Sequence, residues 1–461
     1  MPERQPWPVT VSAAGYTEPD VPLEACDRLL EELTGEPRTG PRGPLASCVR
    51  PDGTVVVKPN LVRDFHPEGP PGLQAITTHP SVIAAVVRAA SLAVGPGGSV
   101  VVCDTPLQSA DFDALRRNTR LDAYLEAANV GGARLRVLDL RTRRLQPASP
   151  GVPFAVHRLP GDPAGYEAAE LGDRSKLQRL GNAAAFAVGD YDPAETVEAH
   201  RNRHTFILSR TVLDADLIIS VPKLKTHCKT GMTGALKNFI GICGEKSFLP
   251  HFRRGSPQTG GDEFASDSSI KTLHRGTVAL LAHRYPRTFR LLRRLARPTL
   301  RAVATLRRED LALLRSLNGS WPGNDTLWRT VHDVHAAAKF WSDGRFDPSR
   351  PGRRILHVLD AVVSGQGQGP LLCRPVHTGC LMAGWDPVAM DFVGAVLLGI
   401  DPATLPVLTH ALDSDPYPLG LTGLSPAEAC RQASLLGARI GVAEATLPAG
   451  WESVRATRVP A

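Results

Sequence analysis

Short runs of consecutive apolar residues alternate along this chain with longer stretches in which apolar residues recur at helical spacing. The runs at 54–58, 99–104 and 134–140 predict buried strands, and the spacing over 81–93 and 112–128 predicts helices. Strands that alternate with helices in this way form a sheet of parallel neighbours, because each helix returns the chain to the start of the next strand. We therefore expect an α/β fold with a mostly parallel sheet, helices on both of its faces, and insertions.

The alternation resumes after a polar, irregular region at 145–200. The predicted elements are strands within 204–210 and 214–227, a helix from about Gly234, a helix over 332–341, strands over 353–362 and 377–384, and a helix over 386–399 with Asp386 as its N-cap. We divide the chain into an N-terminal extension (1–50) with a helix near 23–33, a core (51–400) with insertions at about 145–200 and 277–325, and a C-terminal helical and loop extension (401–461).

The composition is that of a large globular protein, because 461 residues with 42% hydrophobic content can bury a sizeable core. The N-terminus has no basic region followed by an apolar run, and no apolar stretch approaches the roughly 20 residues of a membrane span, so we expect a cytoplasmic protein. The eight cysteines are scattered without a CxxC pair, which argues against a zinc ribbon and a cysteine-ligated iron–sulfur cluster. The excess of arginine, alanine, glycine and proline is typical of bacteria with GC-rich genomes.

The net charge of +7 is concentrated in one segment. Residues 283–308 contain nine arginines, no acid, and leucines at helical spacing, which predicts a basic amphipathic helix. Such helices bind acidic proteins or membrane surfaces, so residues 284–308 are a candidate docking segment. The alternative is a helical insertion that packs on the domain through its leucines. No nucleic-acid-binding motif accompanies the segment, which argues against a nucleic-acid partner.

Lysine is used in one place in a chain that otherwise uses arginine. Of the 53 basic residues 44 are arginine, yet five of the nine lysines lie within 223–246, which reads KLKTHCKTGMTGALKNFIGICGEK. A lysine cluster on this background indicates a need for a compact, titratable ammonium group. The alternative is a solvated basic face, but the interleaved glycines, threonines and histidine favour a binding site.

Polar residues follow two predicted strands at the positions where ligands bind in open α/β sheets. Lys58 and Asn60 leave the strand VVVKPNL, and Thr78 and His79 precede the helix that starts near Ser81. A lysine next to a helix N-terminus is typical of an anion site, because unpaired amides and the helix dipole favour negative charge. The alternatives are a simple helix cap and a snorkelling lysine.

The third motif, 222–241, combines tight turns with hydroxyl and amine groups. Its candidate ligands for an anion are Thr230, Gly231, Thr233, Gly234, Lys237 and Asn238. The spacing GxxxxGK[ST] is absent, which argues against a Walker-type nucleotide triphosphatase. His227 lies among lysines that lower the pKa of its imidazole, so the neutral ring is a candidate base or metal ligand, with a structural histidine as the alternative.

The fourth motif is LDAVVSGQGQGP, in which alternate glycines follow a strand. Gly367 and Gly369 allow a close backbone approach to a ligand, although the pattern is a weak dinucleotide signal. The carboxylates of Asp386 and Asp391 are candidate metal ligands or bases, and Asp386 serves equally well as an N-cap. We expect Lys58, His79, His227, Lys237 and the glycine loop to line one cleft, because each follows a strand at the same sheet edge.

Together these strings resemble the domain of unknown function 362 family from about Val55 to Ile400. They carry its strand-KPN motif, its T-x-H-P motif, its LKTH…G-x-T-x-x-LKN-x-x-G block and its D-x-x-x-x-x-x-G-x-GP…D-P-x-A-x-D tail. The resemblance implies an α/β fold but defines no reaction. Many members carry a ferredoxin-like domain with cysteine-ligated clusters, and this chain departs from them because it has none.

Our leading hypothesis is an enzyme of specialised metabolism that acts on a phosphate- or carboxylate-bearing small molecule. Its reaction would be of the lyase, isomerase or transferase type, with His227, Lys225 and His79 in proton transfer and Lys58 and Lys237 holding the anion. A variant of this hypothesis adds a divalent metal, with His227, His251, Asp386 and Asp391 as candidate ligands. The alternative from another class is a noncatalytic anion sensor or scaffold that docks through residues 284–308.

Overall fold

The computed structural model describes residues 10–13, 15–16, 20–147, 154–189, 191–266, 317–421 and 423–456. The candidate docking segment 284–308 lies outside the described residues, so the expectations for it stay predictions.

A nine-stranded sheet forms the centre of the described structure. Its main path runs in the order β1 (Thr10–Ala13), β17 (Leu372–Gly384), β16 (Ile355–Gln368), β10 (Leu217–Val221), β2 (Thr54–Pro59), β3 (Ser99–Asp104) and β4 (Arg134–Asp139). Strands β16, β10, β2, β3 and β4 are parallel, and β17 is antiparallel to β16. The mostly parallel α/β architecture predicted from the sequence is thereby confirmed.

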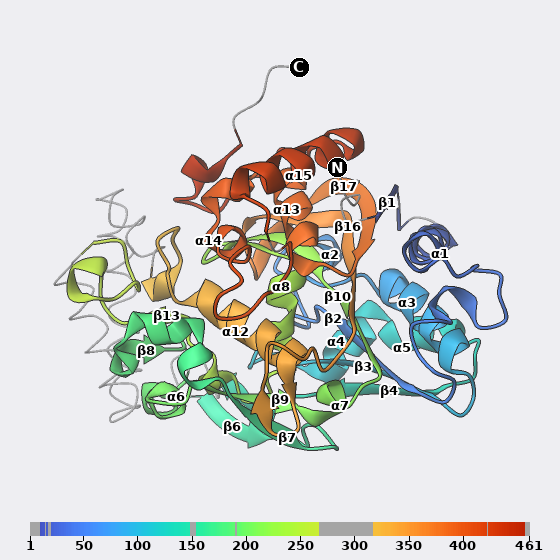
Figure 1. Ribbon diagram of the computed structural model, residues 1–461, viewed down its shortest axis with the longest axis horizontal. Coiled ribbons are helices and arrows are strands. Elements are labelled where there is room, and N and C mark those ends of the chain that lie inside the picture. Colours follow the sequence, from blue (N-terminus) through green and yellow to red (C-terminus); the bar gives the residue numbers. More distant parts are fainter. Residues whose placement is uncertain are drawn as a thin grey trace.

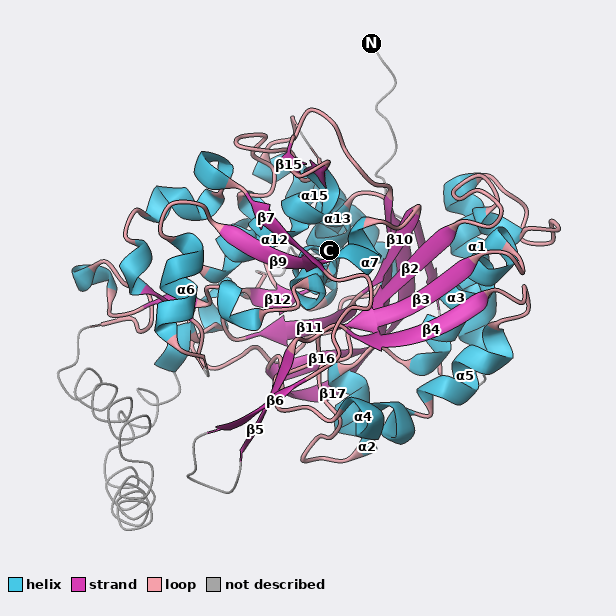
Figure 2. Cartoon of the chain, turned by 90° about the horizontal axis from the view of Figure 1, so that it is seen from below, coloured by secondary structure: helices cyan, strands magenta, loops and turns pink. Residues whose placement is uncertain are grey.

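Helices cover both faces of this sheet, as Figures 1 and 2 show. Helices α1 (Asp20–Thr34), α3 (Pro80–Val94) and α5 (Leu121–Ala128) lie on one face, and α8 (Ala235–Asn238), α12 (Leu327–Phe340) and α13 (Pro387–Leu397) lie on the other. The apolar run of β2 reflects this arrangement, because Val55 and Val57 belong to one core and Val56 to the other. Such strands are apolar on both sides.

Strand β10 is followed by a hairpin that carries much of the lysine cluster. After Pro222 the chain continues as β11 (Lys223–His227), which pairs in parallel with the second half of β16 and in antiparallel with β12 (Gly231–Thr233). Figure 2 shows this hairpin beyond the carboxyl ends of the parallel strands. Lys223, Lys225 and His227 alternate with Leu224 and Thr226, so they share one face of the hairpin.

Two predicted helices differ from the expectation in length. The helix predicted over 112–128 is two helices, α4 (Phe112–Thr119) and α5, because Arg120 adopts a left-handed conformation with φ of 55° between them. The helix predicted from about Gly234 is a single α-helical turn, α8, that continues as a 3-10 helix.

The insertion at 145–200 and the region after 401 add short elements around this core. They and the remaining elements are α2 (Pro70–Ile76), β5 (Arg143–Pro147), β6 (Phe154–Arg158), β7 (Tyr166–Glu170), β8 (Phe186–Ala187), α6 (Pro193–His200), β9 (Thr205–Ser209), α7 (Arg210–Leu213), β13 (Phe252–Arg253), β14 (Trp341–Ser342), β15 (Arg345–Phe346), α14 (Pro406–Thr409) and α15 (Pro426–Ile440). Strand β7 pairs with β9, and β8 pairs with β13, so the insertion is joined to the core by strand pairing.

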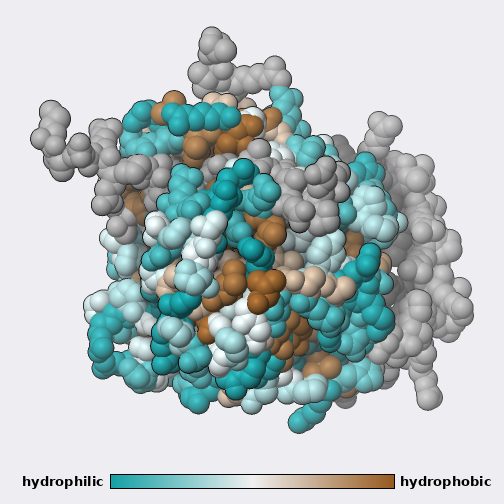
Figure 3. All heavy atoms as spheres, turned by 90° about the vertical axis from the view of Figure 1, so that its right-hand side faces the viewer, coloured by the Kyte–Doolittle hydropathy of each residue, from teal (hydrophilic) through white to brown (hydrophobic). Residues whose placement is uncertain are grey.

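Hydrophilic residues and smaller groups of hydrophobic ones share the molecular face that Figure 3 shows, a mixture usual for protein surfaces. Within the described residues, no single helix has the length and apolar character needed to cross a membrane. By length and composition alone, the bent pair of α2 and α3 would meet that requirement.

Candidate functional site

Lys58 ends β2 as a fully buried ammonium group that already has a counterion. Its Nζ lies 2.8 Å from Oδ1 of Asp104, donates to Oδ1 of Asn238 at 3.1 Å, and donates to the carbonyl of the next residue at 2.7 Å. Gly241 packs directly on this ion pair, because a Cβ there would lie 2.1 Å from Oδ1 of Asp104. The sequence analysis missed Asp104, although an acid that ends the strand next to Lys58 is a readable signal. Lys58 therefore organises the sheet edge and is not a free cation.

Lys225 on β11 lies beside this pair and is held by neutral groups. Its Nζ donates to Oδ1 of Asn60 at 2.7 Å and to the carbonyl of Ile76 at 2.6 Å. The amide nitrogen of Asn60 lies 3.5 Å from Oδ1 of Asn238, which in turn accepts from Lys58. The two asparagines thus join the two lysines in one polar network.

The charge of Lys225 is not balanced by an acid. In the described part of the chain its side chain is fully buried and makes no ion pair. Burial, helped by the ammonium groups of Lys237 and Lys223, lowers the pKa of Lys225 to about 7. This amine can therefore exchange a proton near neutral pH.

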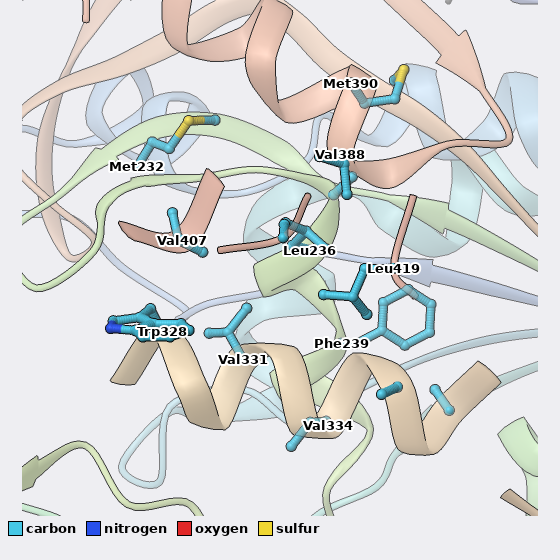
Figure 4. Packing of buried hydrophobic residues seen from close by; sticks show 14 of the residues in the cluster. Met232, Leu236, Phe239, Trp328, Val331, Val334, Val388, Met390, Val407 and Leu419 are labelled. Atoms are coloured by element: carbon cyan, nitrogen blue, oxygen red, sulfur yellow. The ribbon is translucent and has the colours of Figure 1, made fainter. Parts of the chain in front are cut away.

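Lys237 is the second cation without an acid. Leu236 on α8 and Phe239, the residue that follows α8, pack against α12 in Figure 4, and this packing fixes the turn that carries Lys237. Among the described residues its ammonium group has no hydrogen-bond or ion-pair partner, although solvent reaches the side chain only in part. Burial, followed by the charges of Lys229 and Lys58, lowers the pKa of Lys237 to about 8. Cations gathered in this way favour a bound anion.

Two imidazoles next to these lysines have opposite hydrogen-bonding roles. Nδ1 of His227 lies 3.1 Å from the backbone N–H of Lys229 and accepts from it, so the neutral ring carries its hydrogen on Nε2. Nδ1 of His251 lies 2.6 Å from the carbonyl of Leu249 and donates to it, so its Nε2 is an acceptor. Burial, with the charges of Lys229 and Lys237, holds both pKa values well below the usual range. His227 is therefore a hydrogen-bond donor, and His251 has the free lone pair that a base or a metal ligand needs.

Two predicted hydroxyl ligands have internal partners. The hydroxyl of Thr78 accepts from the backbone N–H of Asn60 at 2.8 Å and donates to the carbonyl of Val221 at 2.7 Å. The hydroxyl of Thr230 donates to the carbonyl of Met232 at 3.0 Å and closes the hairpin turn. Both threonines therefore stabilise the backbone around the site through these hydrogen bonds.

Three other threonine hydroxyls near the lysines are buried and have no partner in the described structure: those of Thr77, Thr105 and Thr233. Thr233 lies directly opposite Lys225 in the β11–β12 ladder, so both side chains lie on one face of the hairpin. The carbonyl of Thr105 accepts from Nζ of Lys246 at 2.8 Å, a contact that the sequence analysis missed. Unpaired buried hydroxyls cost stability, and a ligand oxygen would satisfy them.

His79 lies in a separate cluster. Its backbone N–H donates to Oδ2 of Asp360 at 2.9 Å, its Nδ1 contacts the Ser81 hydroxyl at 2.7 Å, and its ring stacks on Tyr16 at 3.9 Å. Asp360 also binds the buried Lys223 at 3.0 Å. Burial lowers the pKa of His79 to about 4. Within the described residues, the side chain of His79 thus contacts Ser81 and Tyr16 at the start of α3 and makes no hydrogen bond to Lys58, Lys225 or Lys237.

The candidate metal carboxylates accept backbone amides. Asp391 binds the amides of Ala235 and Leu236 at the start of α8, and Asp386 binds amides at the start of α13 and that of Leu421. Burial raises the pKa of Asp391 to about 7. No group of three or more His, Cys, Asp or Glu side chains suited to a metal occurs within the described ranges. The geometry therefore does not bring the proposed metal ligands together.

The glycines that were predicted to let the backbone approach a ligand have a structural role in close backbone packing. A Cβ on Gly369 would lie 1.8 Å from the carbonyl oxygen of Thr226, and one on Gly234 would lie 2.0 Å from Oδ1 of Asp391. The other two predicted glycines, Gly231 and Gly367, have positive φ. These positions need glycine for the fold whether or not a ligand binds.

The fold and this site define a class of protein: an α/β protein with buried lysines and histidines beyond the carboxyl ends of its parallel strands. The family model described as "Domain of unknown function (DUF362)" matches residues 55–160 and 161–396, so the chain belongs to this family. The chain is also similar to the thylakoid-associated protein sll1697 of Synechocystis sp., with 22% identity over 368 residues that cover 80% of this chain and 70% of the relative. No solved structure matches the chain.

Proposed function

We propose that the protein is an enzyme that acts on an anionic small molecule by lysine and histidine acid–base chemistry. The observation that carries the proposal is the Lys237 ammonium group, which among the described residues has no counterion and no hydrogen-bond partner while other cations surround it. A phosphate or carboxylate group would neutralise this cluster, and the free hydroxyl of Thr233 would donate to one of its oxygens.

The two imidazoles supply the chemistry in this proposal. His227 presents Nε2–H, which as a neutral hydrogen-bond donor polarises a carbonyl or stabilises an oxyanion and keeps its proton. His251 presents a free Nε2, which accepts a proton. A neutral donor and a neutral base, both influenced by the charges of Lys229 and Lys237, would support the removal and return of a proton next to a carbonyl, a step of isomerases and lyases. A noncatalytic anion sensor would use the same lysines without turnover, and metal analysis of the purified protein tests the variant with a divalent ion.

Binding of simple anions to the full chain tests this proposal. Inorganic phosphate and oxalate are titrated in turn into a chloride buffer while the melting temperature is recorded. We expect at least one of them to stabilise the protein, because a ligand at about 100 times its Kd adds about 2.7 kcal/mol.

Lys237→Met should abolish this stabilisation. The control is Arg439→Met on α15, which removes a positive charge from an exposed position and should leave the anion effect unchanged. Equal stabilisation of the wild type and Lys237→Met by the same anion would overturn the proposal.

A further inference from the structure

Lys225 donates two hydrogen bonds, the number that a neutral amine can donate. Its Nζ has two acceptors, the side-chain oxygen of Asn60 at 2.7 Å and the carbonyl of Ile76 at 2.6 Å, and both are uncharged. An ammonium group has three hydrogens to donate, whereas a neutral amine has two hydrogens and one lone pair. With both hydrogens held, the lone pair of a neutral Lys225 points in the remaining direction.

The surroundings of Lys225 favour the neutral form of this amine and provide groups for a reaction. The fully buried side chain makes no ion pair within the described ranges, and the charges of Lys237 and Lys223 oppose a third cation. His227 lies two positions further along the same face of β11, and the unpaired hydroxyl of Thr233 lies opposite in the ladder. A desolvated lysine next to other cations is the arrangement that activates lysine as a nucleophile.

We infer that Lys225 forms an imine with a carbonyl carbon of the substrate, so that the substrate class is a small 2-oxo acid. The inference rests on the proposed function, because the carboxylate of the 2-oxo acid is the anion assigned to Lys237. The partly exposed side chain of Asn60 accepts a hydrogen bond from Lys225 and marks the side from which a small acid approaches.

The step balances without an added oxidant or reductant. The Lys225 lone pair forms a bond to the carbonyl carbon, and the carbonyl π electrons move to oxygen, which accepts a hydrogen bond from Nε2–H of His227. The nitrogen loses its two protons in turn to His251, and His251 passes both to the oxygen, which leaves as water. The products are one imine and one water molecule. Protonated, the imine accepts electrons from a C–H bond on the carbon next to the imine carbon, which suits proton abstraction there.

Reductive trapping tests the inference on the full chain. The protein is incubated with pyruvate and borohydride, and its intact mass and proteolytic peptides are measured. We expect one reduced pyruvate unit per chain, on the peptide that contains Lys225, and we expect inorganic phosphate to suppress it by competing for Lys237. Lys225→Arg should remove the adduct, and Lys339→Arg, which changes a lysine on α12, should retain it.

The peptide map of the wild type decides the inference even where a variant folds poorly. Attachment of pyruvate at another lysine, or no attachment at all, would overturn it. Stabilisation of the chain by phosphate and its loss in Lys237→Met test the proposed function independently. Phosphate stabilisation without an adduct would therefore refute the imine and retain the anion site.

Discussion

Lys237→Met should make the ligand-free protein more stable while it removes anion binding. The substitution keeps the length of the side chain and removes the charge, so it leaves the packing of α8 in place. In the folded protein that charge is partly buried, has no described partner, and lies near Lys229 and Lys58. A binding residue that destabilises the fold when no ligand is bound is expected to show this trade-off: its removal raises stability and abolishes binding.

The size of the effect follows from the pKa of Lys237, which falls from 10.5 to about 8 on folding. Each unit of pKa corresponds to about 1.4 kcal/mol, so the charged form costs on the order of 3 kcal/mol at pH 7. Solvent reaches part of the side chain and screens the charge, which reduces the expected gain for methionine to about 1–2 kcal/mol.

The pH dependence of stability gives a second measurement of the free-energy cost of the Lys237 charge. Because the folded pKa lies below the unfolded one, the unfolded chain binds more protons between about pH 8 and 10.5, and wild-type stability rises with pH over this window. The penalty disappears once Lys237 is neutral in both states. The advantage of Lys237→Met should therefore be largest at pH 7 and vanish by pH 10.5.

Urea unfolding followed by circular dichroism at pH 7 and at pH 10, with and without phosphate, measures the stability difference, its pH dependence and the effect of the anion. Lys246 also has a lowered pKa, but Lys237 is not among its causes, so its contribution cancels in the comparison. The charge of Lys237 helps to lower the pKa of Lys225, so the gain in Lys237→Met includes the relief of this repulsion. Lys237→Arg is the control, because it keeps the positive charge at pH 7 but replaces the compact ammonium with a planar guanidinium group that misplaces the anion. A lower stability of Lys237→Met at pH 7, or full phosphate binding by either variant, would refute the reasoning.

Three further substitutions test the surrounding structure. Gly241→Ala should destabilise the chain by about 3–5 kcal/mol in urea unfolding, because its Cβ would lie 2.1 Å from Oδ1 of Asp104 and separate a buried ion pair. The control Gly189→Ala should have little effect, because its Cβ has no neighbour closer than 4.0 Å. His251→Gln should slow the exchange of pyruvate methyl protons with solvent deuterium, followed by NMR, by about 100-fold and leave phosphate binding unchanged; unaltered exchange would exclude His251 as the base. Asp391→Asn should cost about 1–3 kcal/mol in the same unfolding assay, because an amide cannot accept from both backbone N–H groups at the start of α8.

The sheet and part of the site could be predicted from the sequence because both follow from strand order. Apolar runs buried on two faces identify parallel strands, and residues that leave those strands meet at one edge. From this rule we expected Lys58, His79, His227, Lys237 and the glycine loop to line one cleft. The structure joins Lys58 to Asn60, Asn238 and Lys225 by hydrogen bonds, whereas His79 contacts Asp360 and Tyr16.

Other features depend on contacts that no local pattern reveals. The tautomers of His227 and His251 follow from single backbone groups that face their rings. Tyr16 reaches Lys223 from the N-terminal segment, at 2.7 Å between the hydroxyl oxygen and Nζ, and no spacing in the sequence indicates this contact. Asp391 looks like a ligand in the sequence but binds amides on α8, a partner distant along the chain.

The preference for lysine in a chain rich in arginine follows from the same contacts. Lys58 and Lys223 are paired with carboxylates, and an arginine could in principle provide that charge. Lys225 and Lys237 are buried without a described acid, and their pKa values fall to about 7 and about 8. A guanidinium group keeps its proton under these conditions, so an arginine would remain a buried, unpaired charge, whereas a lysine can release its proton or hold an anion. The need for a cation that can also become neutral therefore explains lysine at these two positions, and it is the property that both the anion site and the imine require.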